Sequence, residues 1–175
     1  MDAYDMEKAD KAILAKIERG ESLSKFDKLI SKHKSAHKVV LLLDTSGSMS
    51  SQADSPGERR IDALRGVVNG LRVKGLTFKQ LIFGSDIMWS DIIPEPEGGT
   101  NLTGALEFVE KAAPEHLIIV SDGEPDDKES AVTVAKRLGC KIDIFFVGPS
   151  GSYGESYLKQ LAASTGGASE TVSFK

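Results

Sequence analysis

Apolar residues along the chain follow two different spacings, and the spacing changes near Lys38. Within residues 5–19 they recur at every third or fourth position, which predicts an amphipathic helix, and a second helical pattern begins at Ser24. From Lys38 onwards, short unbroken apolar runs alternate with helical patterns. We therefore divide the chain into an N-terminal helical extension, residues 1–36, and a main domain, residues 37–175.

The apolar runs of the main domain predict strands at 38–43, 76–84, 86–91, 116–120, 141–147 and 170–174. Helical patterns lie between them at 59–71, 101–113, 126–139 and 155–164. Runs such as KVVLLL and HLIIV are apolar on both faces, which is typical of parallel strands covered by helices on both sides. The expected fold class is α/β, with a doubly wound, mostly parallel central sheet of the Rossmann-like kind.

Composition narrows the range of functions. The chain has 175 residues, a formal net charge of −4 and one cysteine, so an intrachain disulfide is excluded. The mild negative charge argues against nucleic-acid binding, and no apolar run approaches the length of a membrane span. The N-terminus is acidic and has no apolar signal core. We expect a cytoplasmic protein that contacts no membrane and is a monomer when isolated.

Hydroxyl and carboxyl side chains follow the ends of buried strands. The segment VVLLLDTSGSMS ends its apolar run at an aspartate, SDGEPDD follows the HLIIV run, and EGGTNL precedes a predicted helix. In doubly wound sheets, ligands bind beyond the carboxyl ends of the strands, where the strand order reverses. Three loops are therefore expected to converge there and to bring together Asp44, Ser46, Ser48, Thr100 and Asp122.

This donor set predicts a site for a hard divalent cation. Oxygen-only ligands favour Mg²⁺, or Mn²⁺, over zinc or copper. Hydroxyls are neutral ligands, so a shell with only two carboxylates leaves the cation strongly electrophilic. An Asp or Glu side chain from a partner protein would then be a strong additional ligand. The pattern thus predicts a metal-bridged protein contact.

The same residues resemble the von Willebrand factor type A (VWA) domain. Asp44-Thr45-Ser46-Gly47-Ser48 matches the Asp-x-Ser-x-Ser motif of its metal-ion-dependent adhesion site (MIDAS), and Thr100 and Ser121-Asp122-Gly123 follow in family order. Arg60-Ile61-Asp62-Ala63 resembles the start of the family's first helix, and LIFGSD resembles its second strand. The resemblance covers roughly residues 37–174.

The resemblance implies roles for individual residues. Ser46, Ser48 and Thr100 would be hydroxyl ligands, and Asp44 and Asp122 would bind the cation directly or through water. It further implies a non-enzymatic, Mg²⁺-dependent adhesion or adaptor module. Intracellular members of the family often work beside AAA+ ATPases or in larger assemblies, and such a partner would supply the carboxylate.

The chain departs from the family pattern at one end. The family sheet usually ends with a strand that is followed by a C-terminal helix, whereas this sequence ends just after its last predicted strand. We expect the helix at 5–19 to cover the sheet face that the missing helix would otherwise occupy. An affinity switch driven by that C-terminal helix is in doubt for the same reason.

An enzyme is the main alternative. Haloacid-dehalogenase-like phosphatases also bind Mg²⁺ after the first strand of a doubly wound sheet, but their first motif is usually Asp-x-Asp, and Ser46 occupies the place of the general acid. There is no cap insertion, no G-x-S-x-G elbow and no P-loop. DTSG is not an aspartic protease motif, because that family needs Asp-Thr-Gly on an all-β fold.

Some of these residues, and several outside the predicted site, can also be explained by a purely structural role. Taken alone, DTSGSM also fits a turn followed by a helix cap. Asp126 and Asp127 are interpreted as acids at a helix start, with a peripheral effect on the charge of the site as the alternative. Trp89 is expected to pack on an edge strand, with partner contact as the alternative. The three histidines have no ligand spacing and are expected at the surface or at strand ends.

Overall fold

The fold of the main domain is seen in a computed structural model, which describes residues 38–53, 57–123 and 125–172. The predicted extension at residues 1–36 lies outside the described residues. So do the helix at 5–19 and its expected place on the sheet.

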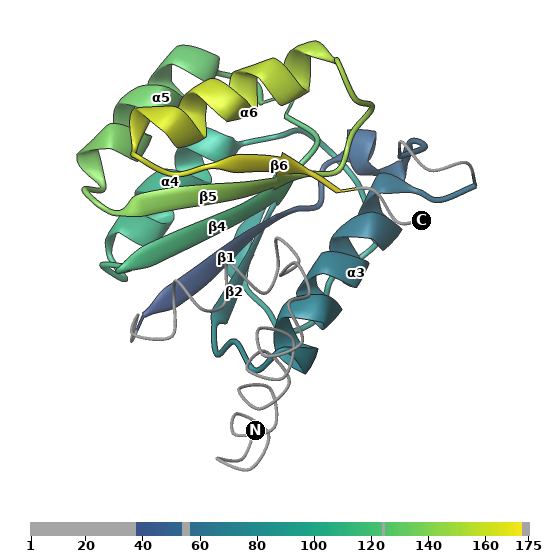
Figure 1. Ribbon diagram of the computed structural model, residues 1–175, viewed down its shortest axis with the longest axis horizontal. Helices are drawn as coiled ribbons and strands as arrows, with labels where there is room; N and C mark the ends of the chain where they lie inside the picture. Colours follow the sequence, from purple (N-terminus) through teal and green to yellow (C-terminus); the bar gives the residue numbers. More distant parts are fainter. Residues whose placement is uncertain (1–37, 54–56, 124, 173–175) are drawn as a thin grey trace, which may run out of the picture.

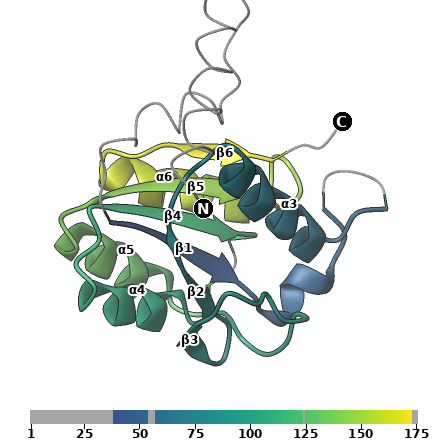
Figure 2. The same cartoon turned by 90° about the horizontal axis from the view of Figure 1, so that it is seen from below.

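Within the described residues, six strands form one sheet in the order β3-β2-β1-β4-β5-β6 (Figures 1 and 2). Every neighbouring pair is parallel except β2 and β3, which are antiparallel. The predicted α/β class with a mostly parallel sheet is therefore confirmed. The strand bounds are Val39–Asp44 for β1, Lys79–Phe83 for β2, Ile87–Trp89 for β3, His116–Ser121 for β4, Lys141–Phe146 for β5 and Ser169–Thr171 for β6.

Helices cover both faces of the sheet, as Figures 1 and 2 show. Helices α4, α5 and α6 lie on one face, and α3 lies on the other. No helix within the described ranges is long and apolar enough to cross a membrane. The helix bounds are Arg60–Val73 for α3, Leu102–Glu110 for α4, Lys128–Arg137 for α5 and Tyr153–Ser164 for α6, and a 3-10 helix, η1, spans Gly47–Ser50.

The central strands are buried on both sides because their side chains alternate between two cores. In β1, Val40 and Leu42 face the α4–α6 side, whereas Leu41 and Leu43 face α3. All six residues of β1 and of β4 are buried. Each fully buried leucine contributes about 1.5–3 kcal/mol. These strands therefore form a rigid base for the loops that follow them.

The strand order reverses between β1 and β4. From β1 the chain crosses through α3 to β2 on one side, and from β2 and β3 it crosses through α4 to β4 on the other side. The carboxyl ends of β1 and β4 are thus adjacent at the reversal point, where open α/β sheets bind ligands. Asp44 ends β1, and Asp122 directly follows β4.

Three interpretations from the sequence can be compared with the structure. His116 lies at a strand end, as expected, but it is buried and its Nε2 is 3.0 Å from Oδ2 of Asp143. Trp89 lies on the edge strand β3 and packs against Phe108, with ring centroids 6.1 Å apart. Asp127 caps α5 by accepting a hydrogen bond from a first-turn backbone N–H, as its interpretation required.

Candidate metal centre

The first candidate ligand, Asp44, is fully buried at the end of β1. Its Oδ1 accepts a 2.9 Å hydrogen bond from the backbone N–H of Ser46, and its Oδ2 accepts one of 2.6 Å from the hydroxyl of Ser121. The Ser121 hydroxyl in turn accepts from the backbone N–H of Gly123 at 3.0 Å. Both carboxylate oxygens are thus held in fixed directions by the strand ends of β1 and β4.

The motif loop after β1 turns at once into η1, which positions its two serines. Met49 in η1 is completely buried in the α3-side core and anchors the loop. Ser46 is buried, and its Oγ lies 3.1 Å from Oγ of Ser48. The two hydroxyls therefore occupy the same side of the loop, as the alternate spacing in the sequence predicted.

The loop that carries Thr100 is tied to the motif loop through backbone hydrogen bonds. Gly47 donates to the carbonyl of Gly98 at 3.0 Å, and Glu97 donates to the carbonyl of Thr45 at 2.9 Å. Thr100 is itself buried just before α4. The structure thus brings Thr100 to the same edge of the sheet as Ser46 and Ser48.

Asp126 fixes the position of Thr100 from the third loop. Its carboxylate accepts a 3.2 Å hydrogen bond from the backbone N–H of Thr100, and its own N–H donates to the Thr100 carbonyl at 3.1 Å. Asp126 is therefore more than an acid at a helix start. It joins the loop after β4 to the loop before α4, and through Thr100 it belongs to the surroundings of the site.

Asp122 is the most informative residue of the site. Its Oδ2 accepts a 2.7 Å hydrogen bond from Nη1 of Arg60, with which it forms an ion pair. Its Oδ1 is buried and has no hydrogen-bond partner among the described residues. A buried carboxylate oxygen without a donor is costly, because it has lost water and gained nothing in return. A cation at this position would offset that cost.

Two glycines hold the Asp122 loop against α6. Gly123 has a φ of +78°, and a Cβ built on it would lie 2.4 Å from the carbonyl oxygen of Gly154. A Cβ on Gly154 would lie 2.3 Å from the carbonyl oxygen of Asp122. Neither position has room for a side chain, so the two backbones are in direct contact. The first turn of α6 therefore limits where the backbone of Asp122 can lie.

Electrostatics at the site favours a cation. Burial, together with the negative charge of nearby Asp122, raises the pKa of Asp44 to about 7. The hydrogen bonds from Ser121 and Ser46 act in the opposite direction but do not cancel this effect. A divalent cation beside Asp44 would relieve this unfavourable effect on its charged form.

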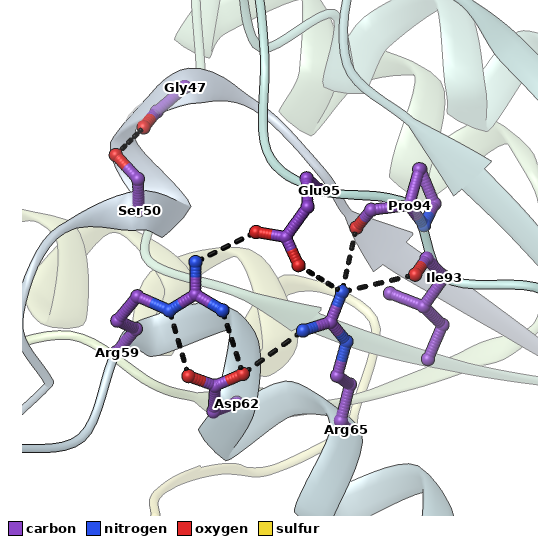
Figure 3. Close-up of polar contacts among 8 residues, drawn as sticks. All are labelled: Gly47, Ser50, Arg59, Asp62, Arg65, Ile93, Pro94 and Glu95. Carbon is purple, nitrogen blue, oxygen red and sulfur yellow. Dashed lines mark hydrogen bonds and ion pairs between the residues drawn. The ribbon is translucent and has the colours of Figure 1, made fainter.

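An ion-pair network at the start of α3 holds the long loop between β3 and α4 (Figure 3). Arg59 and Arg65 both contact Asp62 in the first turns of α3 and both contact Glu95 in the loop, at distances of 2.7–3.2 Å. Arg65 also donates to two loop carbonyls. The hydrogen bonds from Arg59 lower the pKa values of both carboxyl groups. The network secures the loop that ends at Thr100.

The residues present fit a hard divalent cation. The five candidates offer two carboxylates and three hydroxyls, all oxygen donors. Among the described residues, no group of three or more His, Cys, Asp or Glu side chains is placed to hold a metal ion. The structure also places Arg60, Ser121 and Asp126 beside the candidate ligands. The sequence interpretation gave no site role to Arg60 or Ser121, and it gave Asp126 an effect on the charge of the site only as the alternative.

Comparisons with known proteins bear on the fold. No protein-family profile and no curated protein matches the sequence. Among solved structures, the chain is similar to manganese-loaded TRAP protein from Plasmodium vivax, with 21% identity and a TM-score of 0.57 over 72% of this chain and 62% of that one. The chain thus has an α/β, Rossmann-like fold, which is consistent with the VWA domain that its sequence resembles.

A second solved structure, the RO (RSR) protein of Deinococcus radiodurans, matches with 14% identity and a TM-score of 0.44 over 74% of this chain and 34% of that one. The chain thus spans less than two thirds of either solved structure. At 21% identity the likeness to the TRAP protein shows the fold alone, and the chemistry of the site rests on its own residues.

Proposed function

We propose that this protein is a non-enzymatic protein-binding module that works through a divalent cation, Mg²⁺ or Mn²⁺. The cation would be held by Asp44, Ser46, Ser48, Thr100 and Asp122. When bound, it would supply an electrophilic site for a carboxylate of a partner protein.

The observation that carries the proposal is the buried Oδ1 of Asp122, which has no hydrogen-bond partner among the described residues. It lies at the switch point of the sheet, close enough to Asp44 that the charge of Asp122 raises the pKa of the Asp44 carboxyl. Support also comes from the P. vivax TRAP protein, which has the same type of fold and was crystallised loaded with manganese.

Different residues of the site would orient the ligands and bind the cation. Ser121 and the backbone of Ser46 orient Asp44, and Asp126 orients the backbone of Thr100. The serine and threonine hydroxyls are neutral, so they would solvate the cation without cancelling its charge. An adaptor role beside an AAA+ ATPase or within a larger assembly is part of this proposal, with the partner supplying an Asp or Glu.

The first experiment measures Mn²⁺ binding by isothermal titration calorimetry to wild-type protein, Ser46→Ala and Ser51→Ala. Ser51 is a matched control, because it follows η1, is exposed, and its described hydrogen bonds use only its backbone. Ser46→Ala should bind Mn²⁺ at least about tenfold more weakly, whereas Ser51→Ala should match the wild type. Equal binding by all three would contradict the assigned ligands.

The partner interaction is tested by affinity capture from a cell lysate. Wild-type protein in Mg²⁺ and Ser51→Ala in Mg²⁺ should retain a protein that is lost in EDTA and with Ser46→Ala. If the partner protein were retained equally well in EDTA, a metal-bridged contact would be excluded. An assay with an aryl phosphate tests the enzymatic alternative, and Mg²⁺-dependent turnover that Asp44→Asn abolishes would favour a phosphatase.

A further inference from the structure

Arg60 occupies a position that a simple cation site does not require. It is the first residue of α3, and its side chain is only 12% exposed. Its guanidinium forms a 2.7 Å ion pair with Oδ2 of Asp122, one of the two carboxylates assigned to the cation. A permanent positive charge therefore lies directly beside the place proposed for a second positive charge.

The orientation of Arg60 is fixed by the motif loop itself. Its Nη1 is 3.4 Å from the carbonyl oxygen of Ser48, and its Nε donates to the carbonyl of Gln52 at 3.3 Å. A guanidinium remains protonated in proteins, so Arg60 cannot reduce the repulsion by losing a proton. Its charge is thus a constant part of the site.

Arg60 changes the formal net charge of the cation-bound site. With a cation bound, both carboxyl groups would be ionised, so Asp44 and Asp122 would contribute −2 and Arg60 would bring the protein's share to −1. A divalent cation then leaves a net charge of +1, whereas the same site without Arg60 would become neutral. The excess positive charge would be compensated by an anionic ligand, and a carboxylate is such a ligand.

We propose that Arg60 tunes the site: it weakens the binding of the divalent cation and makes the bound cation favour a carboxylate from the partner. Arg60 acts through its charge on Asp122, so it is a specificity-determining residue and not a metal ligand. This inference rests on the proposed function, because it assumes that the site takes a cation.

The test compares Mn²⁺ binding to metal-free wild-type protein, Arg60→Gln, Arg60→Lys and Arg72→Gln by calorimetry. Arg72→Gln removes the same charge from the last turn of α3, about 18 Å along the helix, where Arg72 contacts Gln80. Arg60→Gln should bind Mn²⁺ about tenfold more tightly than the wild type, and Arg72→Gln should match it. A merely structural Arg60 would give the opposite result, since disturbing Asp122 would weaken binding.

A second arm uses acetate as the carboxylate probe. Acetate is titrated into Mn²⁺-loaded protein, and water proton relaxation reports its binding near the metal. Arg60→Gln should bind acetate at least roughly threefold more weakly than the wild type, because its loaded site is neutral. Equal acetate affinity in both proteins would overturn the preference for carboxylate.

The outcomes separate the two proposals. Wild-type protein that binds no Mn²⁺ would overturn the proposed function and this inference together. Wild-type binding with equal or weaker binding by Arg60→Gln would overturn only the role of Arg60. If Arg60→Gln does not fold, Arg60→Met replaces it, because it also removes the charge but keeps an apolar stem, and it should bind Mn²⁺ about tenfold more tightly than the wild type. Arg60→Lys keeps the charge and should bind Mn²⁺ within about threefold of the wild type. A tenfold gain in Arg60→Lys would contradict a role based on charge.

Discussion

Ser121 donates a 2.6 Å hydrogen bond to Oδ2 of Asp44, although the two residues are 77 positions apart in the chain. The bond joins the end of β4 to the end of β1 across the point where the strand order reverses. Because Asp44 is fully buried, no solvent is available to replace this donor. The contact therefore bears both on stability and on the direction in which Asp44 presents its oxygens.

Ser121→Ala should lower the free energy of unfolding in EDTA by about 1–3 kcal/mol, the usual cost of depriving a buried acceptor of its donor. Mn²⁺ affinity should fall about tenfold, since Asp44 loses an orienting contact. Urea unfolding and calorimetry measure the two effects. Ser156→Ala, an exposed position on α6, should stay within about 0.5 kcal/mol of the wild type. A Ser121→Ala protein that resembles this control would show that the bond contributes nothing.

Thr100→Val tests a buried candidate ligand whose hydrogen bonds to other described residues all use its backbone. Valine keeps the shape of threonine and removes the hydroxyl, so stability in EDTA should change by less than about 1 kcal/mol. The rise in melting temperature on adding MgCl₂ should shrink, because a ligand stabilises in proportion to its affinity. Differential scanning fluorimetry with and without Mg²⁺ measures both. If MgCl₂ raised the melting temperature of Thr100→Val as much as that of the wild type, Thr100 would not be a ligand.

Glu95→Gln should loosen the loop that leads to Thr100. The change removes the ion pairs to Arg59 and Arg65 but leaves Asp62 in place. Amide hydrogen exchange at residues 93–100 should become faster. High salt should have a similar effect on the wild type, because these pairs are exposed and screened.

The matched control for Glu95 is Glu110→Gln, which breaks an exposed pair with Arg137 between α4 and α5. Exchange at residues 93–100 should not respond to this variant. If both variants left exchange unchanged there, the network in Figure 3 would have no role in holding the loop.

Tyr157 should make stability depend on alkaline pH. Burial, and then the negative charge of Asp127, raise the pKa of its phenol to about 12. In the unfolded chain the phenol titrates near ~10, so the folded state holds the proton more firmly. This contribution is complete below about pH 10 and is lost as the pH rises towards about 12.

The wild type should therefore lose roughly 2 kcal/mol more of unfolding free energy than Tyr157→Phe between about pH 9.5 and about pH 12. Chemical denaturation at a series of pH values measures the difference. Ser156→Ala is the control, because Ser156 is a neighbouring exposed residue without a phenol and should keep the wild-type profile. Parallel profiles for wild type and Tyr157→Phe would show that the phenol titrates as in the unfolded chain.

The sequence predicted the central strands well because burial on both faces leaves a simple pattern. VVLLL and HLIIV are apolar at every position or nearly so, and both strands lie within one residue of their expected bounds. The bounds of peripheral elements were less accurate. The expected strand at 86–91 is only Ile87–Trp89, since an edge strand with exposed residues has a weak apolar pattern.

The candidate ligands could be proposed from the sequence because loops that follow parallel strands meet at one edge of the sheet. The supporting residues could not, because contacts between distant side chains leave no local pattern. Arg60 and Asp122 are 62 positions apart. In the sequence, Asp126 and Asp127 look alike, since both are acids at the start of a predicted helix. Only the structure shows that Asp127 caps α5 and that Asp126 contacts Thr100.

The contact between Gly123 and Gly154 also limits how this fold can vary among relatives. At each position a Cβ would meet the backbone of the other segment, so a larger residue at one cannot be compensated by a smaller residue at the other. The two positions should therefore be inherited as a pair. A relative that replaces either glycine would have to move its counterpart of α6 away from the loop after β4. The residue equivalent to Asp122 would then change its position as well.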